Sequence, residues 1–313
     1  MITLRQLQVF AEVAEAGGSV TQAAAKLDVS QPSVSDTVRS LEQSLDTKLL
    51  AGRGQARGLT AAGETYRAYA ARILALVAEG HQALADLQDT VAGQLRLVAV
   101  PTAGEHLVQA ALHPFVQRYP EVEIALRVAN RAAAIGPLND GWADLAVMGR
   151  PPANVRLEAH AFLPNRLMLA CAPEHPLAGG TSDLGEVAEA TMLIREPGSG
   201  TRAAVEQVFA SAGLELRRTM EIGSNAAVIA ALHQRLGISV LPEIAIAQDL
   251  AAGHLVSVEA PGFPLEREWH ILRRADSYLS APARAFIEQL TACTIDVDGS
   301  VSTESRSNHR HQD

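Results

Sequence analysis

The sequence predicts an α/β protein in three parts: an N-terminal winged helix-turn-helix, a long linker helix, and an α/β domain of two subdomains. Three observations lead to this fold class. Short alanine-rich helical patterns surround Ser30-Gln31-Pro32, a proline-free helical stretch covers residues 60–91, and strand patterns alternate with helical ones from Leu95 onward. A chain of 313 residues has room for these parts, because domains usually hold about 100–200 residues.

Composition excludes several classes of protein. Hydrophobic residues make up 48% of the chain, and only two cysteines are present, so packed cores are expected and a disulfide framework is not. The first residues carry Glu12 and Glu15 and no long apolar run, so we expect neither a signal peptide nor a membrane span. The net charge is −9, which argues against a protein that binds nucleic acids nonspecifically through overall positive charge.

Three short helices are predicted at the N-terminus. Gly17-Gly18 ends the first helix, since glycine readily adopts the left-handed conformation of a helix C-cap. Ser19 is a suitable N-cap for the second helix and Ser30 for the third, where Pro32 lies in the first turn and removes no intrahelical hydrogen bond. Two helices joined by such a tight turn are typical of a helix-turn-helix, whose second helix enters the DNA major groove.

The third helix has an inner and an outer face. Val34, Val38, Leu41 and Leu45 fall on one stripe and should pack inward. Amide and hydroxyl groups on the outer face suit base edges, and basic side chains suit phosphates. The residues expected to contact DNA are Gln31, Pro32, Ser33, Asp36, Thr37, Arg39, Lys48, Arg53 and Arg57. The alternative is a small helical bundle with no DNA-binding role.

A wing and a linker helix should follow. Glycines and arginines between short apolar runs predict a β-hairpin wing that completes a DNA-binding domain over residues 1–59. Residues 1–60 hold as many acidic as basic side chains, which predicts modest affinity for each head and favours an oligomer.

The linker, residues 60–92, carries an apolar seam that steps by four and three residues. The seam consists of Tyr66, Ala70, Ile73, Val77, Gly80, Leu84, Leu87 and Val91. Such a heptad pattern predicts that the helix packs on another helix, either of a second copy, which we prefer, or of its own domain.

The remaining chain predicts an α/β domain over residues 93–293, followed by a polar and therefore disordered tail over residues 294–313. Alternation of strands with helices favours a largely parallel sheet. Strands are expected at residues 95–100, 122–128, 144–149, 167–172, 191–194, 220–222, 238–241, 255–258 and 269–273.

Two segments are suited to hold an anion. Pro101-Thr102-Ala103-Gly104 and Glu196-Pro197-Gly198-Ser199-Gly200-Thr201-Arg202 both place hydroxyl groups at the start of a predicted helix. Helix N-termini attract carboxylate, phosphate or sulfate, because their unpaired N–H groups and the helix dipole point at the ligand. The alternative is an ordinary capped helix start, with Arg202 paired to Glu206.

Residues 19–45, with Leu59-Thr60-Ala61-Ala62-Gly63, resemble the DNA-binding head of LysR-type transcriptional regulators. The residues that carry the resemblance are Ala23-Ala24, Leu27, Ser30-Gln31-Pro32-Ser33-Val34-Ser35, Leu41-Glu42 and Leu45. The chain departs from the family pattern at Asp46 and Arg235, where glycine is typical, and at Gly52, where the wing typically has arginine. The C-terminal half is similar to the family's effector-binding domain, whose fold resembles periplasmic solute-binding proteins.

This resemblance implies a ligand cleft between two subdomains, one of residues 93–164 and 270–293 and one of residues 165–269. It also implies a linker helix that forms a dimer, often within a tetramer. The residues expected to bind the effector are Thr102, Asn130, Met148, Ser199, Gly200, Thr201, Arg202 and Asn225. The sequence REPGSGTR resembles regulators of carbon-fixation or of sulfur and nitrogen genes, which implies an oxyanion or phosphorylated effector.

Catalytic motifs are missing from the sequence. Gly198-Ser199-Gly200-Thr201 is not followed by the lysine of a P-loop, and Ser199 does not lie in a GxSxG motif. His106 and His113 are accompanied by no cysteine or carboxylate cluster. We therefore expect no enzyme, no metal site and no cofactor apart from a small-molecule effector.

These observations predict a cytoplasmic LysR-type regulator whose promoter binding or activation responds to a small anionic metabolite. Its expected partners are double-stranded promoter DNA, that metabolite and a second copy in a homodimer or homotetramer, with RNA polymerase as a further candidate and no membrane. One alternative is a two-domain α/β enzyme with an accessory N-terminal helical domain, which would carry perturbed acid or base groups in its cleft. A solute-binding or transport component is disfavoured by the missing export signal.

Overall fold

The computed structural model describes residues 1–51, 58–88, 90–151, 157–295 and 301–303. The chain forms two compact units. One consists of Met1–Gln88 with Asn139–Trp142, and the other of Asp89–Leu138 with Ala143–Asp313. Each unit has its own hydrophobic core.

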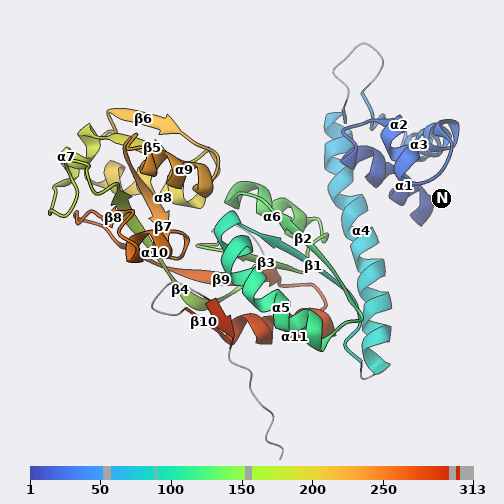
Figure 1. Cartoon of the computed structure of the whole chain (residues 1–313). Helices are drawn as coiled ribbons and strands as arrows, with labels where there is room; N and C mark the ends of the chain where they lie inside the picture. Colours follow the sequence, from blue (N-terminus) through green and yellow to red (C-terminus); the bar gives the residue numbers. More distant parts are fainter. Residues whose placement is uncertain (52–57, 89, 152–156, 296–300, 304–313) are drawn as a thin grey trace, which may run out of the picture. The chain divides into compact units, whose positions relative to one another are not determined.

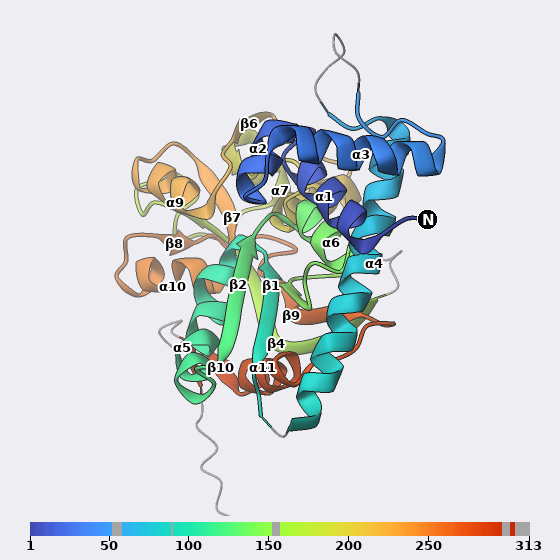
Figure 2. The same ribbon diagram turned by 90° about the vertical axis from the view of Figure 1, so that its right-hand side faces the viewer.

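The described residues of the first unit include four α-helices: α1 (Leu4–Glu15), α2 (Val20–Lys26), α3 (Gln31–Leu45) and α4 (Ala61–Ala85). A 3₁₀ turn at Asp86–Gln88 follows α4. α1 packs against both α3 and α4, and α2 packs against α3 (Figure 2). Each helix begins at a hydroxyl residue whose side chain accepts a hydrogen bond from the amide three residues on, which satisfies one donor of the first turn. These N-caps are Thr3, Ser19, Ser30 and Thr60.

The predicted inner face of α3 is confirmed. Val34, Val38 and Leu41 are buried, and Leu45 is half-buried. Two clusters of apolar side chains hold the helices together. They consist of Val9, Val13, Ala23, Ala24, Val34 and Val38, and of Leu7, Phe10, Leu41, Leu49 and Ala70.

The apolar seam of the linker divides into two parts. Tyr66 and Ala70 pack on the head, where the Tyr66 ring lies 5.8 Å from the Phe10 ring between centroids. The alternative of packing within the same domain therefore holds for the first turns of α4. Farther along, α4 ends at Ala85, short of the predicted residue 91. Large apolar side chains on one side of α4 are exposed, namely Ile73 and Leu84 of the seam, Tyr69 and Leu76 next to it and, in the following turn, Leu87.

Only the base of the predicted wing lies among the described residues. Leu50 and Leu59 form an isolated antiparallel bridge, and the Ala51 amide donates to the Gly58 carbonyl at 3.0 Å. Residues 52–57, which include the predicted DNA-contacting Arg53 and Arg57, lie outside the described part of the chain.

Nine strands of the second unit form one sheet. The bounds of the strands are β1 Gly93–Ala99, β2 Val122–Val128, β3 Leu145–Met148, β4 Leu157–Cys171, β5 Thr191–Ile194, β6 Arg218–Glu221, β7 Ile238–Pro242, β8 Val256–Ser257 and β9 Leu265–Arg274. Their order is β2-β1-β3-β9-β4-β7-β5-β6, with β8 beside β4.

The expectation of a largely parallel sheet is wrong at its centre. β1 pairs in parallel with β2 and β3, and β5 pairs in parallel with β6 and β7. Between these two parallel groups, β4 and β9 run antiparallel along nearly their whole length and connect the groups (Figure 1). The predicted strand at 167–172 is only the end of β4, which begins ten residues earlier at residue 157. The part of β4 that pairs with β9 was therefore almost entirely missing from the prediction.

Helices cover the sheet and enclose three clusters of buried side chains. The helices are a π-helix at Ala103–Val108, α5 Gln109–Arg118, α6 Arg131–Asn139, α7 Leu184–Glu189, α8 Gly200–Ser211, α9 Asn225–His233, α10 Glu243–Ala251 and α11 Ala281–Thr291. In the cluster beside β1 and β3, Phe115 of α5 meets Phe286 of α11 edge to face at 5.2 Å between centroids. Trp269 and Ile244 also pack in this cluster, although the expected boundaries put them in the other subdomain.

The prediction of a disordered tail is wrong for part of it. β10 (Cys293–Ile295) and β11 (Val301–Thr303) pair as antiparallel strands. β11 contacts α5, and Val301 of β11 packs against the apolar cluster that α5 helps to form. This packing stabilises a segment whose sequence is mostly polar.

None of the helices in the described chain is both long enough and apolar enough to cross a membrane.

Asp46 at the end of α3 is the basis of a stability prediction. It adopts the left-handed conformation, with φ of 48°, at a position where the family pattern has glycine. Because a Cβ atom costs energy in this conformation, Asp46→Gly should raise the free energy of unfolding of the first unit by about 1 kcal/mol. Hydrogen exchange of the α3 amides would measure the change. Asp46→Ala is the matched control, and an Ala variant as stable as the Gly variant would contradict the explanation.

Candidate DNA interface and ligand cavity

Five of the residues predicted to contact DNA lie on the exposed side of α3. They are Gln31, Pro32, Ser33, Asp36 and Arg39. Thr37, a sixth, is half-buried, and its hydroxyl donates to the Ser33 carbonyl of the preceding turn at 2.7 Å. The exposed amide and hydroxyl of Gln31 and Ser33 are therefore better placed to reach base edges than Thr37.

The two described basic residues of this group are both paired with carboxylates. Arg39 lies 2.9 Å from Asp36 on the same face of α3, and Lys48 lies 2.6 Å from Glu42. These pairs reduce the positive charge that the head presents. Pairing within the protein fits the modest DNA affinity that the neutral composition of the head predicts.

Glu42 is a structural residue whose role the sequence did not reveal. Its buried carboxylate accepts hydrogen bonds from the amides of Leu49 and Leu50, at 2.9 and 3.2 Å, and from Lys48. Burial favours the protonated form, but these hydrogen bonds outweigh it and hold the pKa of Glu42 below its usual value. Glu42 thereby fastens α3 to the base of the wing.

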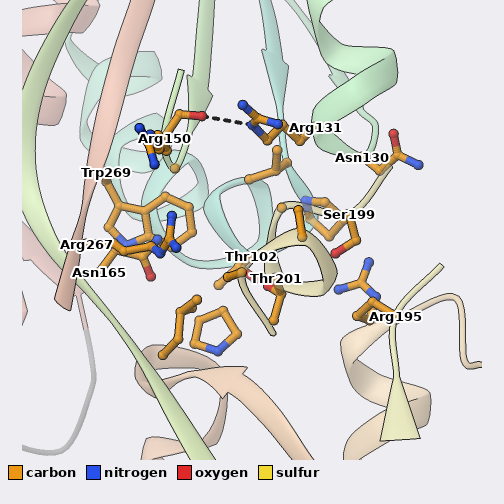
Figure 3. Close-up of a pocket in the computed structure, with 18 of the residues that line it drawn as sticks. Thr102, Asn130, Arg131, Arg150, Asn165, Arg195, Ser199, Thr201, Arg267 and Trp269 are labelled. Atoms are coloured by element: carbon orange, nitrogen blue, oxygen red, sulfur yellow. Dashed lines mark hydrogen bonds between the residues drawn. The ribbon is translucent and has the colours of Figure 1, made fainter. Parts of the chain in front are cut away.

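A cavity of about 260 Å³ lies in the second unit (Figure 3). Residues that follow the carboxyl ends of β1, β2, β3 and β5 line it, together with the start of α8 and side chains of β4 and β9. Ligands of open α/β sheets bind at this edge, because the loops and helix N-termini converge there.

Five of the eight predicted effector-binding residues line this cavity: Thr102, Asn130, Ser199, Gly200 and Thr201. The other three do not. Met148 is fully buried within β3. Arg202 points its guanidinium to Glu206 and Glu221, at 2.8 and 2.7 Å, so the alternative of an Arg202–Glu206 pair is what the structure shows.

Asn225, the third of these residues, acts on the cavity through a neighbour. Its amide nitrogen donates to the Thr102 hydroxyl oxygen at 2.7 Å, and its oxygen accepts from Arg195. Because the Thr102 oxygen already accepts a hydrogen bond from Asn225, the hydroxyl proton is available to an acceptor in the cavity.

The start of α8 is a conventional anion-binding arrangement. Ser199 caps the helix through the Arg202 amide, which leaves the amides of the first helical turn without intrahelical acceptors. Gly198 precedes the cap with φ of +88°, and a Cβ atom there would come within 3.0 Å of the Ala132 Cβ. Gly198 is therefore required for two reasons: its φ is positive, and a side chain would collide with the segment that follows β2.

Four arginines border the cavity, and none of them is among the residues predicted from the sequence to bind the effector. They are Arg131, Arg150, Arg195 and Arg267. Arg195 pairs with Glu196 at 2.8 Å. In the described ranges, no carboxylate lies within ion-pair distance of the other three. They come from four separate segments of sequence, and only the folded sheet brings them together.

Arg267 is the most constrained of the four. Burial, and then the positive charges of Arg150 and Arg131, lower the pKa of its guanidinium below its usual value. An arginine remains protonated nonetheless, so the lowered pKa reflects a charge that is poorly solvated and also repelled by its neighbours, and a bound anion would offset both effects. Arg131 is held in place by a 2.9 Å hydrogen bond from its Nε to the Arg150 carbonyl (Figure 3).

Metal and thiol chemistry find no support in the described part of the chain. None of its histidine, cysteine and carboxylate side chains form a group that could hold a metal ion. Burial raises the pKa of both Cys171 and Cys293 to about 11, so these thiols stay protonated and unreactive near neutral pH.

Comparison with known proteins identifies both units. Residues 4–64 match the family described as bacterial regulatory helix-turn-helix protein, lysR family, and residues 88–293 match LysR substrate binding domain. The RuBisCO operon transcriptional regulator of Allochromatium vinosum is 37% identical over 92% of this chain and 95% of that protein. The transcriptional activator CmpR of Synechocystis is 34% identical over 93% of this chain and 95% of its own.

Solved structures agree with the fold. The regulatory domain of CcmR from Synechocystis PCC6803, in complex with 2-PG, is 31% identical with a TM-score of 0.60, over 64% of this chain and 96% of that one. A variant of full-length OxyR from Pseudomonas aeruginosa is 21% identical with a TM-score of 0.71, over 93% and 94% of the two chains.

The buried carboxylate of Glu42 predicts a pH dependence of the head. Because its pKa is lower in the folded state, its contribution to stability is present above the usual value of 4.5 and is lost as the pH falls through the lower folded value. Glu42→Gln should lower the free energy of unfolding of the head by about 2 kcal/mol at pH 7 and reduce its loss between pH 5 and 3. Urea unfolding followed by circular dichroism would measure both. An unchanged pH profile in the variant would contradict this role.

Proposed function

Because this chain is a DNA-binding transcriptional regulator of the LysR family, we propose that a small polyanionic metabolite, bound in the arginine-lined cavity, controls its action at promoters. The observation that carries this proposal is the positive charge around the cavity. Three of the arginines there have no carboxylate partner in the described chain. The fourth, Arg195, pairs with Glu196. The relatives are regulators, and the alternative of a two-domain enzyme is set aside on that ground.

The hydrogen-bonding groups of the cavity support the same class of ligand. The arginines, the free proton of Thr102 and the amides at the start of α8 are all donors. A ligand that matches them must present acceptors on several sides, as a phosphorylated or carboxylated metabolite does. The CcmR domain that is 31% identical binds 2-PG, which supports 2-PG as the first ligand to test.

The exposed face of α3 is the proposed DNA-reading surface. Gln31 and Ser33 would contact base edges, and Arg39 would contact phosphates once it leaves Asp36. The names of the relatives support promoters of carbon-fixation genes as targets. A regulator of this kind would act in the cytoplasm, where promoter DNA is found, and RNA polymerase is its further candidate partner.

The cavity also offers a route to regulation. Next to the cavity, the segment that follows β2 contacts the turn before α8: Asn130 donates to the Pro197 carbonyl at 3.4 Å, and the Ala132 amide to the Gly198 carbonyl at 3.2 Å. A ligand that binds between these segments makes different contacts when they are close and when they are apart. Such differential contacts are what allosteric control requires.

A mobility-shift assay on upstream promoter DNA tests the proposed function. Addition of 2-PG should change the affinity or the mobility of the wild-type complex. Ser199→Ala removes a cavity hydroxyl, so it should keep DNA binding and lose most of the response. Gln31→Ala combined with Ser33→Ala should weaken specific binding by about 1–3 kcal/mol whether or not 2-PG is present. Wild-type protein that binds no upstream fragment at low salt, or that ignores every anionic metabolite, would contradict the proposal.

A second copy of this chain is the proposed occupant of the exposed apolar row on α4. Tyr69, Ile73, Leu76 and Leu84, with Leu87 beyond them, are separated by three, four or eight residues and so share one face of the helix. Large apolar side chains that stay exposed along one face commonly mark an interface. Gly80 lies in the same row and allows close approach of another helix.

This proposal predicts the effect of one added charge. Leu84→Asp should shift the protein toward the monomer by at least tenfold in dissociation constant, because an unpaired carboxylate would be buried between the helices. Sedimentation equilibrium would measure the change. Ala78→Asp places the same charge on the opposite, exposed face of α4 and should have little effect. Equal oligomeric states in both variants would show that the row is not the interface.

A further inference from the structure

The crossover strands contribute three polar side chains to the wall of the cavity. Asn165 on β4 lies directly opposite Arg267 on β9 in the antiparallel register, and Trp269 follows two residues along β9. Directly opposed residues, and residues two apart on one strand, project from the same face of a sheet. All three side chains line the cavity and gather on one side of it (Figure 3).

Each of these side chains keeps a buried polar atom unsatisfied. The atoms are Asn165 Oδ1, Arg267 Nε and Trp269 Nε1, none of which has a hydrogen-bond partner in the described structure. Asn165 is only 6% exposed and Trp269 only 2%, so bulk water does not solvate them. Buried polar groups are nearly always paired in folded proteins, and three unpaired ones on one wall point to a ligand that supplies the partners.

These groups are separate from the anion-binding start of α8. That start comes from the segment after β5 and acts through a hydroxyl and backbone amides. The crossover strands instead present an arginine and an indole N–H, with Arg131 and Arg150 near enough to repel Arg267. A guanidinium fork and a helix start are both suited to oxyanions, so the cavity offers two separate places for an anionic group.

We propose that Asn165, Arg267 and Trp269 form a second binding subsite, the crossover subsite, which binds one end of an effector that carries two anionic groups. The start of α8 binds the other end. This inference rests on the proposed function, because it divides the same cavity into two subsites. The Asn165 amide offers its oxygen to a ligand hydroxyl or, in the flipped orientation, its NH₂ to an anion. A second, wider hollow is also lined by Arg150 and Arg267.

Isothermal titration of the full chain with two matched probes tests the division. Phosphonoacetate carries a phosphonate and a carboxylate, and ethylphosphonate has a methyl group in place of that carboxylate. Wild-type protein should bind phosphonoacetate about 10–100-fold more tightly than ethylphosphonate. Arg267→Met should remove most of this advantage and leave the affinity for ethylphosphonate unchanged. Ser199→Ala, at the other end, should weaken both probes.

Two further measurements separate the subsite from a general loss of structure. Trp269→Phe keeps the ring and removes only the N–H donor, so it should weaken phosphonoacetate alone. Arg267→Met should unfold at the same temperature as the ligand-free wild type or higher, since it removes one charge from a repelling group. Equal losses for both probes in Arg267→Met, or no loss for either, would overturn the crossover subsite. Wild-type protein that binds both probes equally would refute the subsite alone, and wild-type protein that binds neither would refute the proposed function as well.

Discussion

Arg131, Arg150 and Arg267 face one small cavity, and the chain as described brings no carboxylate into contact with them. Charges of one sign that are held close together raise the free energy of the ligand-free state. An anion of matching shape lowers that energy, so the protein gains stability by binding it. The arrangement would favour an anion over a neutral metabolite, because a neutral ligand would leave the repulsion in place and would meet donors without acceptors.

The fold supplies this arrangement through its crossover. Two groups of parallel strands each place their carboxyl ends at the cavity, and the antiparallel pair β4–β9 connects them. Arg131 and Arg150 follow strands of one group, Arg195 follows a strand of the other, and Arg267 lies on the crossover itself. A change in the separation of the two groups therefore changes the distances among the arginines. On the proposed function, this one set of charges would couple effector binding to the geometry of the domain.

Much of the architecture could be predicted from local patterns. The caps at Ser19 and Ser30 and the buried stripe of Val34, Val38 and Leu41 determine the helix-turn-helix, and all are interactions between residues close in sequence. The start of α8 is local in the same way, which is why Ser199, Gly200 and Thr201 were found. Asp46 reads as a departure from the family, yet it takes up the left-handed conformation that glycine would have had.

The arginines show where such prediction ends. Arg131 and Arg195 are next to segments with predicted site residues, but the local sequence does not show which way any of the four side chains points. Asn165 and Arg267 are 102 positions apart, and only the strand register makes them partners. Arg202 shows the opposite case, since it pairs with Glu206, which the sequence offered as the alternative, and with Glu221, which its local motif does not include. Whether an arginine is neutralised depends on carboxylates that the fold brings near it from other parts of the sequence.

Calorimetric unfolding of the full chain with 2-PG, against chloride at the same ionic strength, tests the central claim most directly. If the uncompensated arginines form an anion site, 2-PG should raise the unfolding temperature of the second unit in a concentration-dependent way. The stabilisation should reach about 2.7 kcal/mol at one hundred times the dissociation constant, and chloride should produce no comparable change. Identical transitions in 2-PG and chloride, together with no response to other small dianions, would contradict the account.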